Sequence, residues 1–101
     1  MTKMQSQTYI DNNHPYTIVT LTELIPGKEG MIQIVSDWGH YAAWWGSMGM
    51  PLRDFILQCD SSYIERSLQV KMNYMGVKKE AFGRLTKFMA HCWPKVREML
   101  T

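Results

Sequence analysis

The sequence has little of what membrane insertion, export or covalent cross-linking requires. None of its 101 residues fall in an apolar run approaching the roughly 18 residues of a membrane span. The first sixteen residues also lack the apolar stretch of a secretory signal. Only two cysteines are present, Cys59 and Cys92, and both lie among apolar residues. We therefore expect a cytoplasmic protein with two reduced, core-facing thiols, and a disulfide between them is the less favoured alternative.

Recognisable catalytic and metal-binding motifs are absent as well. The three histidines are scattered along the chain at His14, His40 and His91. A site built from His91, Cys92 and Cys59 would be one ligand short of the tetrahedral set that zinc usually takes. Asp37 and His40 could form an acid/base pair, but an aspartate at a turn more often caps backbone amides. No glycine-rich phosphate loop or nucleophile elbow occurs. We expect no enzyme activity, no metal and no cofactor.

The first half of the chain has the pattern of β-strands. Residues 5–10, 16–25 and 31–36 are rich in alternating or β-branched apolar residues, and the turn-forming clusters 11–15 and 26–30 separate them. Each connection is short, which favours antiparallel pairing of neighbouring strands. This half therefore predicts an antiparallel meander.

The segment 36–50 fits two structures. As a strand, it places Tyr41, Ala43 and Trp45 on one face, whereas as a helix it places Trp38, Tyr41, Trp45 and Met48 together. Three glycines lie within eleven of its residues. Because each glycine costs a helix roughly 1 kcal/mol, we favour the strand. In either structure the aromatic side chains are expected to face the core.

From Pro51 onward the apolar spacing is that of helices. The predicted helices cover residues 51–60, 62–75 and 77–101. Ser62 and Glu65 have the spacing of a capping box, Gly76 is a C-terminal stop, and Pro94 is expected to kink or interrupt the last helix. Strands followed by helices predict an α+β fold in one domain, residues 1–101. It should contain a meander of three to four strands, in residues 1–50, and about three helices, in residues 51–101.

Charge is distributed unevenly, although the net charge is only +2. Residues 1–65 hold three basic and seven acidic side chains, whereas residues 66–101 hold eight basic and two acidic ones. This asymmetry is typical of chains that contact acidic partners or nucleic acid. The candidate binding residues lie opposite or beside the apolar stripe of the last predicted helix: Lys78, Lys79, Arg84, Lys87, His91 and Arg97. An ordinary solvated surface is the alternative, because no recognised nucleic-acid-binding motif accompanies the charge.

Residues 36–64 resemble a group of small accessory proteins encoded by tailed phages and prophages of enteric bacteria. The shared pattern is Ser-Asp-aromatic-Gly, an aromatic-rich stretch ending in Trp-Gly, and a helix that begins near a proline and contains Phe-Ile or Phe-Leu. The matching residues are Ser36, Asp37, Trp38, Gly39, Tyr41, Trp45, Gly46, Gly49, Phe55 and Leu57. The resemblance implies a phage origin and a host-takeover or counter-defence role of the anti-CRISPR type, and it carries over no catalytic residue.

Together these patterns predict a non-enzymatic phage-derived inhibitor or modulator that binds a host defence complex or a host complex handling nucleic acid. One alternative is a small nucleic-acid-binding regulator that acts through the basic C-terminal helix, and another is an enzyme of unrecognised type. No membrane partner is expected. Neither the host target nor the oligomeric state follows from the sequence.

Overall fold

The N-terminal half forms a single four-stranded antiparallel sheet. The computed structural model describes residues 5–13, 16–74, 76 and 80–101. The strands are β1 (Gln5–Asp11), β2 (Thr17–Ile25), β3 (Glu29–Ser36) and β4 (Gly39–Trp45), and each pairs with the next in chain order. The predicted meander is therefore confirmed, with four strands. The ambiguous segment forms strand β4, whose buried side chains are those expected of a strand: Tyr41, Ala43 and Trp45.

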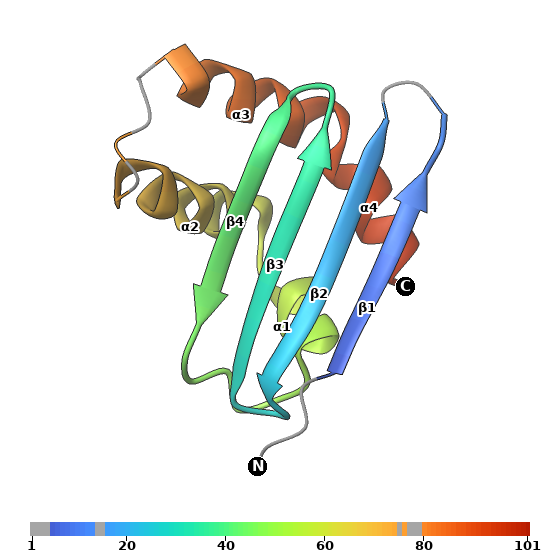
Figure 1. Cartoon of the computed structure of the whole chain (residues 1–101), viewed down its shortest axis with the longest axis vertical. Coiled ribbons are helices and arrows are strands. Elements are labelled where there is room, and N and C mark those ends of the chain that lie inside the picture. Colours follow the sequence, from blue (N-terminus) through green and yellow to red (C-terminus); the bar gives the residue numbers. More distant parts are fainter. Residues whose placement is uncertain (1–4, 14–15, 75, 77–79) are drawn as a thin grey trace.

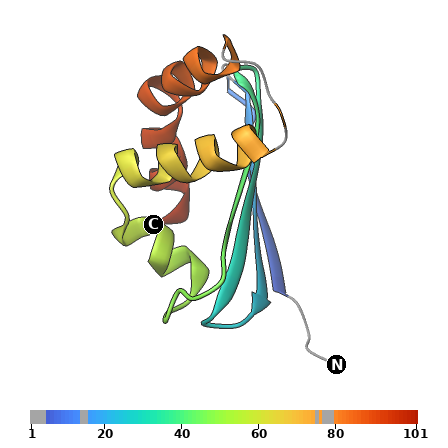
Figure 2. The same cartoon turned by 90° about the vertical axis from the view of Figure 1, so that its left-hand side faces the viewer.

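Four helices follow, and all of them pack on the same face of the sheet (Figures 1 and 2). They are α1 (Leu52–Gln58), α2 (Ser61–Tyr74), α3 (Glu80–His91) and α4 (Trp93–Leu100). The third predicted helix is divided in two, because Pro94 stands in the first turn of α4, where its missing N–H costs nothing. The α+β fold is thus confirmed. No helix in the described part of the chain is long and apolar enough to cross a membrane.

The N-cap of helix α2 is Asp60, two residues before the Ser62 that the capping-box pattern predicted. The carboxylate of Asp60, rather than the hydroxyl of Ser62, accepts a hydrogen bond from the backbone N–H of Tyr63 at 2.8 Å. This is the geometry of an aspartate N-cap, which binds the N–H three residues on. The side chain of Glu65 bonds instead to Gln69, so the predicted capping box is wrong. The predicted stop is confirmed, since Gly76 has a left-handed backbone with φ of 72°.

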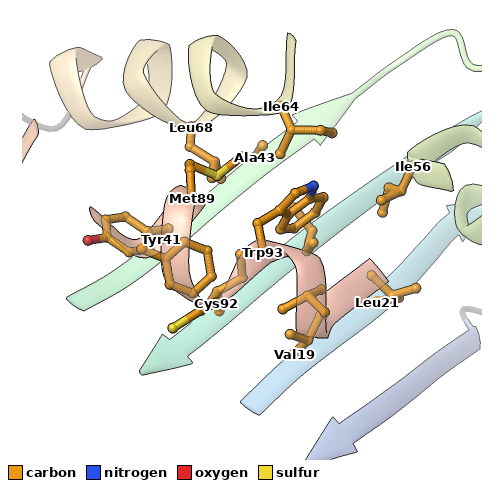
Figure 3. Close-up of a cluster of buried hydrophobic side chains, with 14 of the residues drawn as sticks. Val19, Leu21, Tyr41, Ala43, Ile56, Ile64, Leu68, Met89, Cys92 and Trp93 are labelled. Atoms are coloured by element: carbon orange, nitrogen blue, oxygen red, sulfur yellow. The ribbon is translucent and has the colours of Figure 1, made fainter. Parts of the chain in front are cut away.

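The core lies between the inner face of the sheet and the four helices. Trp93 of α4 is 1% exposed and sits among side chains of α1, α2 and the strands (Figure 3). Its Nε1–H has no hydrogen-bond acceptor among the described residues, an omission that costs about 1–3 kcal/mol. Burying 150–250 Å² of indole contributes about 4–6 kcal/mol at ~25 cal/mol per Å², so the burial outweighs the unpaired donor.

One carboxylate joins the β2–β3 turn to the start of α1. Glu23 on β2 accepts a hydrogen bond from the backbone N–H of Gly27 at 3.1 Å through one oxygen. Its other oxygen accepts from the N–H of Leu52 at 3.3 Å. Gly27 has φ of 75°, a conformation that glycine adopts without strain. Glu23 therefore sets where α1 begins relative to the sheet.

Candidate functional site: the outer surface of helix α3

Helix α3 has one buried side and one exposed side. The buried side chains are Ala81, Leu85, Phe88 and Met89. Phe88 packs against Tyr41 of β4 with ring centroids 5.3 Å apart, which fixes the rotation of the helix. Residues at positions i, i+3 and i+7 share one face of a helix, so Arg84, Lys87 and His91 all lie on the opposite side. All three are exposed, as the sequence predicted.

Two of these residues present cations to solvent. In the described part of the chain, neither Arg84 nor Lys87 forms an ion pair or a side-chain hydrogen bond. Their backbone is held in place by the buried side of α3, so the two charges have a defined spacing on the surface. An unpaired cation on a rigid element can bind an acidic group without first breaking an existing contact.

The third residue, His91, is held against the turn between β3 and β4. Its ring stacks on that of Trp38, with centroids 5.8 Å apart and planes 17° from parallel. The carbonyl of Trp38 accepts a hydrogen bond from the hydroxyl of Tyr41 at 2.7 Å. The stack places the indole of Trp38 beside the C-terminal end of α3. We call Arg84, Lys87 and His91 the α3 surface.

The remaining predicted binding residues do not extend this surface. Arg97 belongs to α4, where its guanidinium donates hydrogen bonds to the carbonyls of Leu57 at 2.8 Å and Cys59 at 3.2 Å. It is half-buried and links α4 to the end of α1. The structure therefore separates Arg97 from the residues with which sequence spacing grouped it. Lys78 and Lys79 lie outside the described residues.

A further basic residue of the C-terminal part has an internal partner. Lys95 of α4 forms an ion pair with Asp11 of β1, with 2.7 Å between Nζ and the carboxylate. The hydrogen bond from Lys95 and one from the backbone N–H of Asn13 lower the pKa of Asp11. The pair connects the edge strand to the last helix. Among the described residues, Arg84 and Lys87 are therefore the basic side chains of α3 and α4 that form no ion pair, side-chain hydrogen bond or ring contact.

The candidate nucleophiles are not activated. Cys92 is buried and Cys59 is half-buried, so the expectation of two core thiols holds fully only for Cys92. Both are free, and burial raises the pKa of each thiol. A raised pKa disfavours the thiolate, which is the reactive form. Asp37 accepts a hydrogen bond from the backbone N–H of Tyr16 at 3.0 Å, so the predicted backbone cap is confirmed. The described residues hold no group of three potential metal ligands.

The structure also contains a cleft that was not predicted. The cleft of about 650 Å³ lies between β1 and the start of α1. Its lining includes Gln5, Gln7, Arg53 and Asp54, together with Glu23, whose oxygens already accept two backbone hydrogen bonds. Because the two walls come from segments about 45 residues apart in the chain, no local pattern of spacing could have indicated the cleft.

Comparison with known proteins supplies the origin of the chain. The sequence profile of a phage family, Phage_phiTE_072, matches residues 2–96. The chain belongs to this phage family. No curated protein and no solved structure matches it. The match extends over all four strands and α3, so the α3 surface lies within the family's common region. The phage origin implied by residues 36–64 is confirmed.

The α3 surface of this phage-family protein presents groups that can bind an acidic partner. It offers two cations and a stacked imidazole on an exposed helix, and the thiol of the neighbouring Cys92 is buried in the core. Charged side chains on a rigid helix guide association and select the partner more than they add affinity. A partner that fits this surface would carry acidic groups.

Proposed function

We propose that this phage-family protein is a non-enzymatic modulator that binds a host protein complex, one that acts in defence or handles nucleic acid. In this proposal it resembles the counter-defence accessory proteins of enterobacterial phages, including inhibitors of the anti-CRISPR type. The observation that supports it most directly is the pair Arg84 and Lys87, which are exposed and form no ion pair or side-chain hydrogen bond with any described residue, on a helix whose other side is packed in the core.

The number of available cations favours a protein partner over nucleic acid. Binding to double-stranded DNA weakens with salt by a logarithmic slope of about 0.9 per phosphate neutralised. Two contacts, from Arg84 and Lys87, would give a slope of about 2, whereas proteins that bind DNA well make about 6–10 such contacts. Arg97 and Lys95 are engaged within the fold. An acidic patch on a protein needs only a few complementary charges to select this surface.

A small nucleic-acid-binding regulator is the second candidate. It is favoured by the eight basic side chains of residues 66–101, among them Lys78 and Lys79 directly before α3. This alternative predicts that the isolated protein binds DNA or RNA tightly and that the affinity falls steeply as the salt concentration rises. The host-complex proposal predicts weak binding to both nucleic acids.

A charge-reversed variant tests the proposal. The double variant Arg84→Glu and Lys87→Glu should keep the fold, because exposed sites typically change stability by about 0.5 kcal/mol or less. Its matched control is Lys28→Glu with Arg53→Glu, which makes the same change in net charge at exposed positions in the β2–β3 turn and α1. Tagged versions of the three proteins would be used to capture partners from bacterial host lysate, with quantitative mass spectrometry.

The expected result is one host complex, retained in stoichiometric amount by the wild type and the control and lost by the α3 variant. A gel-shift titration across salt concentrations would be run with the same proteins. Tight, salt-sensitive binding of nucleic acid with no host protein retained would overturn the proposal in favour of the regulator. Equal retention of the host complex by both variants would exclude Arg84 and Lys87 from the contact.

A further inference from the structure

The face of the sheet turned away from the helices carries three rows of side chains. Each row runs across all four strands and joins residues that are paired side by side. No described helix covers this face (Figure 2). The cross-strand pairing places its residues in the rows Ser6–Thr22–Met31–Trp44, Thr8–Thr20–Gln33–Ala42 and Ile10–Ile18–Val35–His40. We call these twelve residues the open face. It is a surface separate from α3, which packs on the opposite side of the sheet.

The open face contains no charged side chain. None of the twelve residues is Asp, Glu, Lys or Arg, although these make up 20% of the chain. It also holds three of the large apolar side chains that are most exposed, namely Ile10 at 56%, Trp44 at 54% and Val35 at 41%. A sheet face that only meets water normally carries charged residues on many of its outward positions. Such a composition is typical of a surface that is covered.

The hydroxyl groups of this face are already paired with one another. The hydroxyls of Ser6 and Thr22 lie 2.8 Å apart, and those of Thr8 and Thr20 lie 3.3 Å apart. Burial of a polar group is costly mainly when its hydrogen bonds are lost. Because these hydroxyls keep their partners, the face can lose contact with water at a low cost in free energy.

We propose that the open face is the contact between two copies of this chain, packed face to face about a twofold axis parallel to the strands. The absence of charge supports a second copy, because in a twofold contact a surface meets itself. A charged residue near the axis would lie close to its own symmetry mate, and no position of this face would offer it an opposite charge. The absence of cations also disfavours nucleic acid, whose phosphates require them.

Three of the six facing pairs that this symmetry creates are complementary in size or polarity. The axis lies in the interface, so β4 of one copy faces β1 of the other, and β3 faces β2. Trp44 then lies opposite Ser6 of the partner subunit, a large side chain against a small one. Val35 lies opposite Ile18 of the partner subunit, an apolar pair, and Gln33 opposite Thr20 of the partner subunit, a polar pair.

The area of the face indicates a weak dimer. Strands of about seven residues at ~3.4 Å each, and four strands ~4.8 Å apart, give a footprint of roughly 450 Å² per copy. Two copies would therefore bury about 900 Å² in total if the face were flat. The smallest specific interfaces bury about 1,000–1,200 Å² in total. We expect association that depends on protein concentration.

Sedimentation velocity across a concentration series tests the proposal with the full chain. The variant Gln33→Glu keeps the size of an exposed side chain and places a carboxylate near the centre of the face. Its matched control is Gln58→Glu, the same change at an exposed position at the end of α1. The wild type and Gln58→Glu should dimerise alike, and Gln33→Glu should raise the dissociation constant at least about tenfold. Equal melting temperatures of the dilute proteins would show that the fold is intact.

A mixing experiment tests the direction of the axis. Thr20→Lys should also dimerise poorly by itself, but an equimolar mixture with Gln33→Glu should recover dimer. The twofold places position 20 of one copy against position 33 of the other, so the introduced charges attract in the mixed pair. A mixture that stays monomeric would overturn the proposed orientation.

Three results would overturn the dimer itself. The wild type could remain monomeric at every concentration, or it could dimerise with the same constant after Gln33→Glu. A monomer that binds a host protein, and loses it on Gln33→Glu, would assign the face to that host protein instead. The double variant Arg84→Glu and Lys87→Glu should leave the dimer unchanged, so this test and that of the proposed function fail independently.

Discussion

Replacing Arg97 by methionine is expected to destabilise the fold without touching the candidate binding surface. The substitution keeps most of the aliphatic stem but removes the guanidinium, which donates to the carbonyls of Leu57 and Cys59. These carbonyls lie at the end of α1, where helices lack internal donors for their last C=O groups. A hydrogen bond from a charged donor contributes about 1.5–3 kcal/mol. Because water reaches the half-buried site, we expect a total loss of about 2 kcal/mol from the two bonds.

The measurement is thermal unfolding followed by circular dichroism. A loss of 1 kcal/mol lowers the melting temperature of a domain this size by about 4–8 °C, so Arg97→Met should lower it by about 8–16 °C. Lys87→Met is the control, because it also removes one cation, at an exposed position of α3. This variant should change the melting temperature by no more than a few degrees. Arg97→Lys should fall between them, since an ammonium cannot reproduce the planar fork of a guanidinium. Equal shifts for Arg97→Met and Lys87→Met would refute the argument.

Two further predictions concern the neighbouring tryptophans and the thiols. Trp45→Ala should lower the free energy of unfolding by about 3–5 kcal/mol, because this side chain is 8% exposed and packs on Phe55. Trp44 is 54% exposed, so Trp44→Ala should lower the free energy of unfolding of the dilute protein far less. Denaturant unfolding measures both, and equal losses would contradict the burial argument. Because burial raises the pKa of both thiols, a thiol reagent should label the folded protein slowly near neutral pH and faster as the pH rises. Half-buried Cys59 should react before buried Cys92. Mass spectrometry of the labelled protein checks this, and rapid modification of Cys92 in the folded state would show that the site opens or that its thiol is activated.

The strands were predictable because their signal is local. Alternating and β-branched residues, bounded by turn formers, located β1 to β3 to within two residues of their observed ends. The segment after Ser36 was ambiguous because its aromatic residues fit either period. The segment forms a strand because it pairs with β3. This pairing aligns Tyr41 with Ile34 and Ala43 with Ile32 on the buried face.

The candidate site was predictable only in part, for a similar reason. Arg84, Lys87 and His91 are exposed together because the helical period alone places them opposite the apolar stripe of α3. The period could not place Arg97, because Pro94 starts a new helix with a new direction. The stack of His91 on Trp38 joins residues 53 positions apart, and nothing in either local sequence indicates it.

The sequence alone therefore determined the order of strands and helices, the α+β class and the exposure of Arg84 and Lys87, because each depends on spacing within one element. Only the tertiary structure decided which cations remain available, since Lys95 and Arg97 find their partners on other elements. It also decided that one face of the sheet lacks charge, because that face takes alternate residues from four strands, and only their pairing brings those residues together.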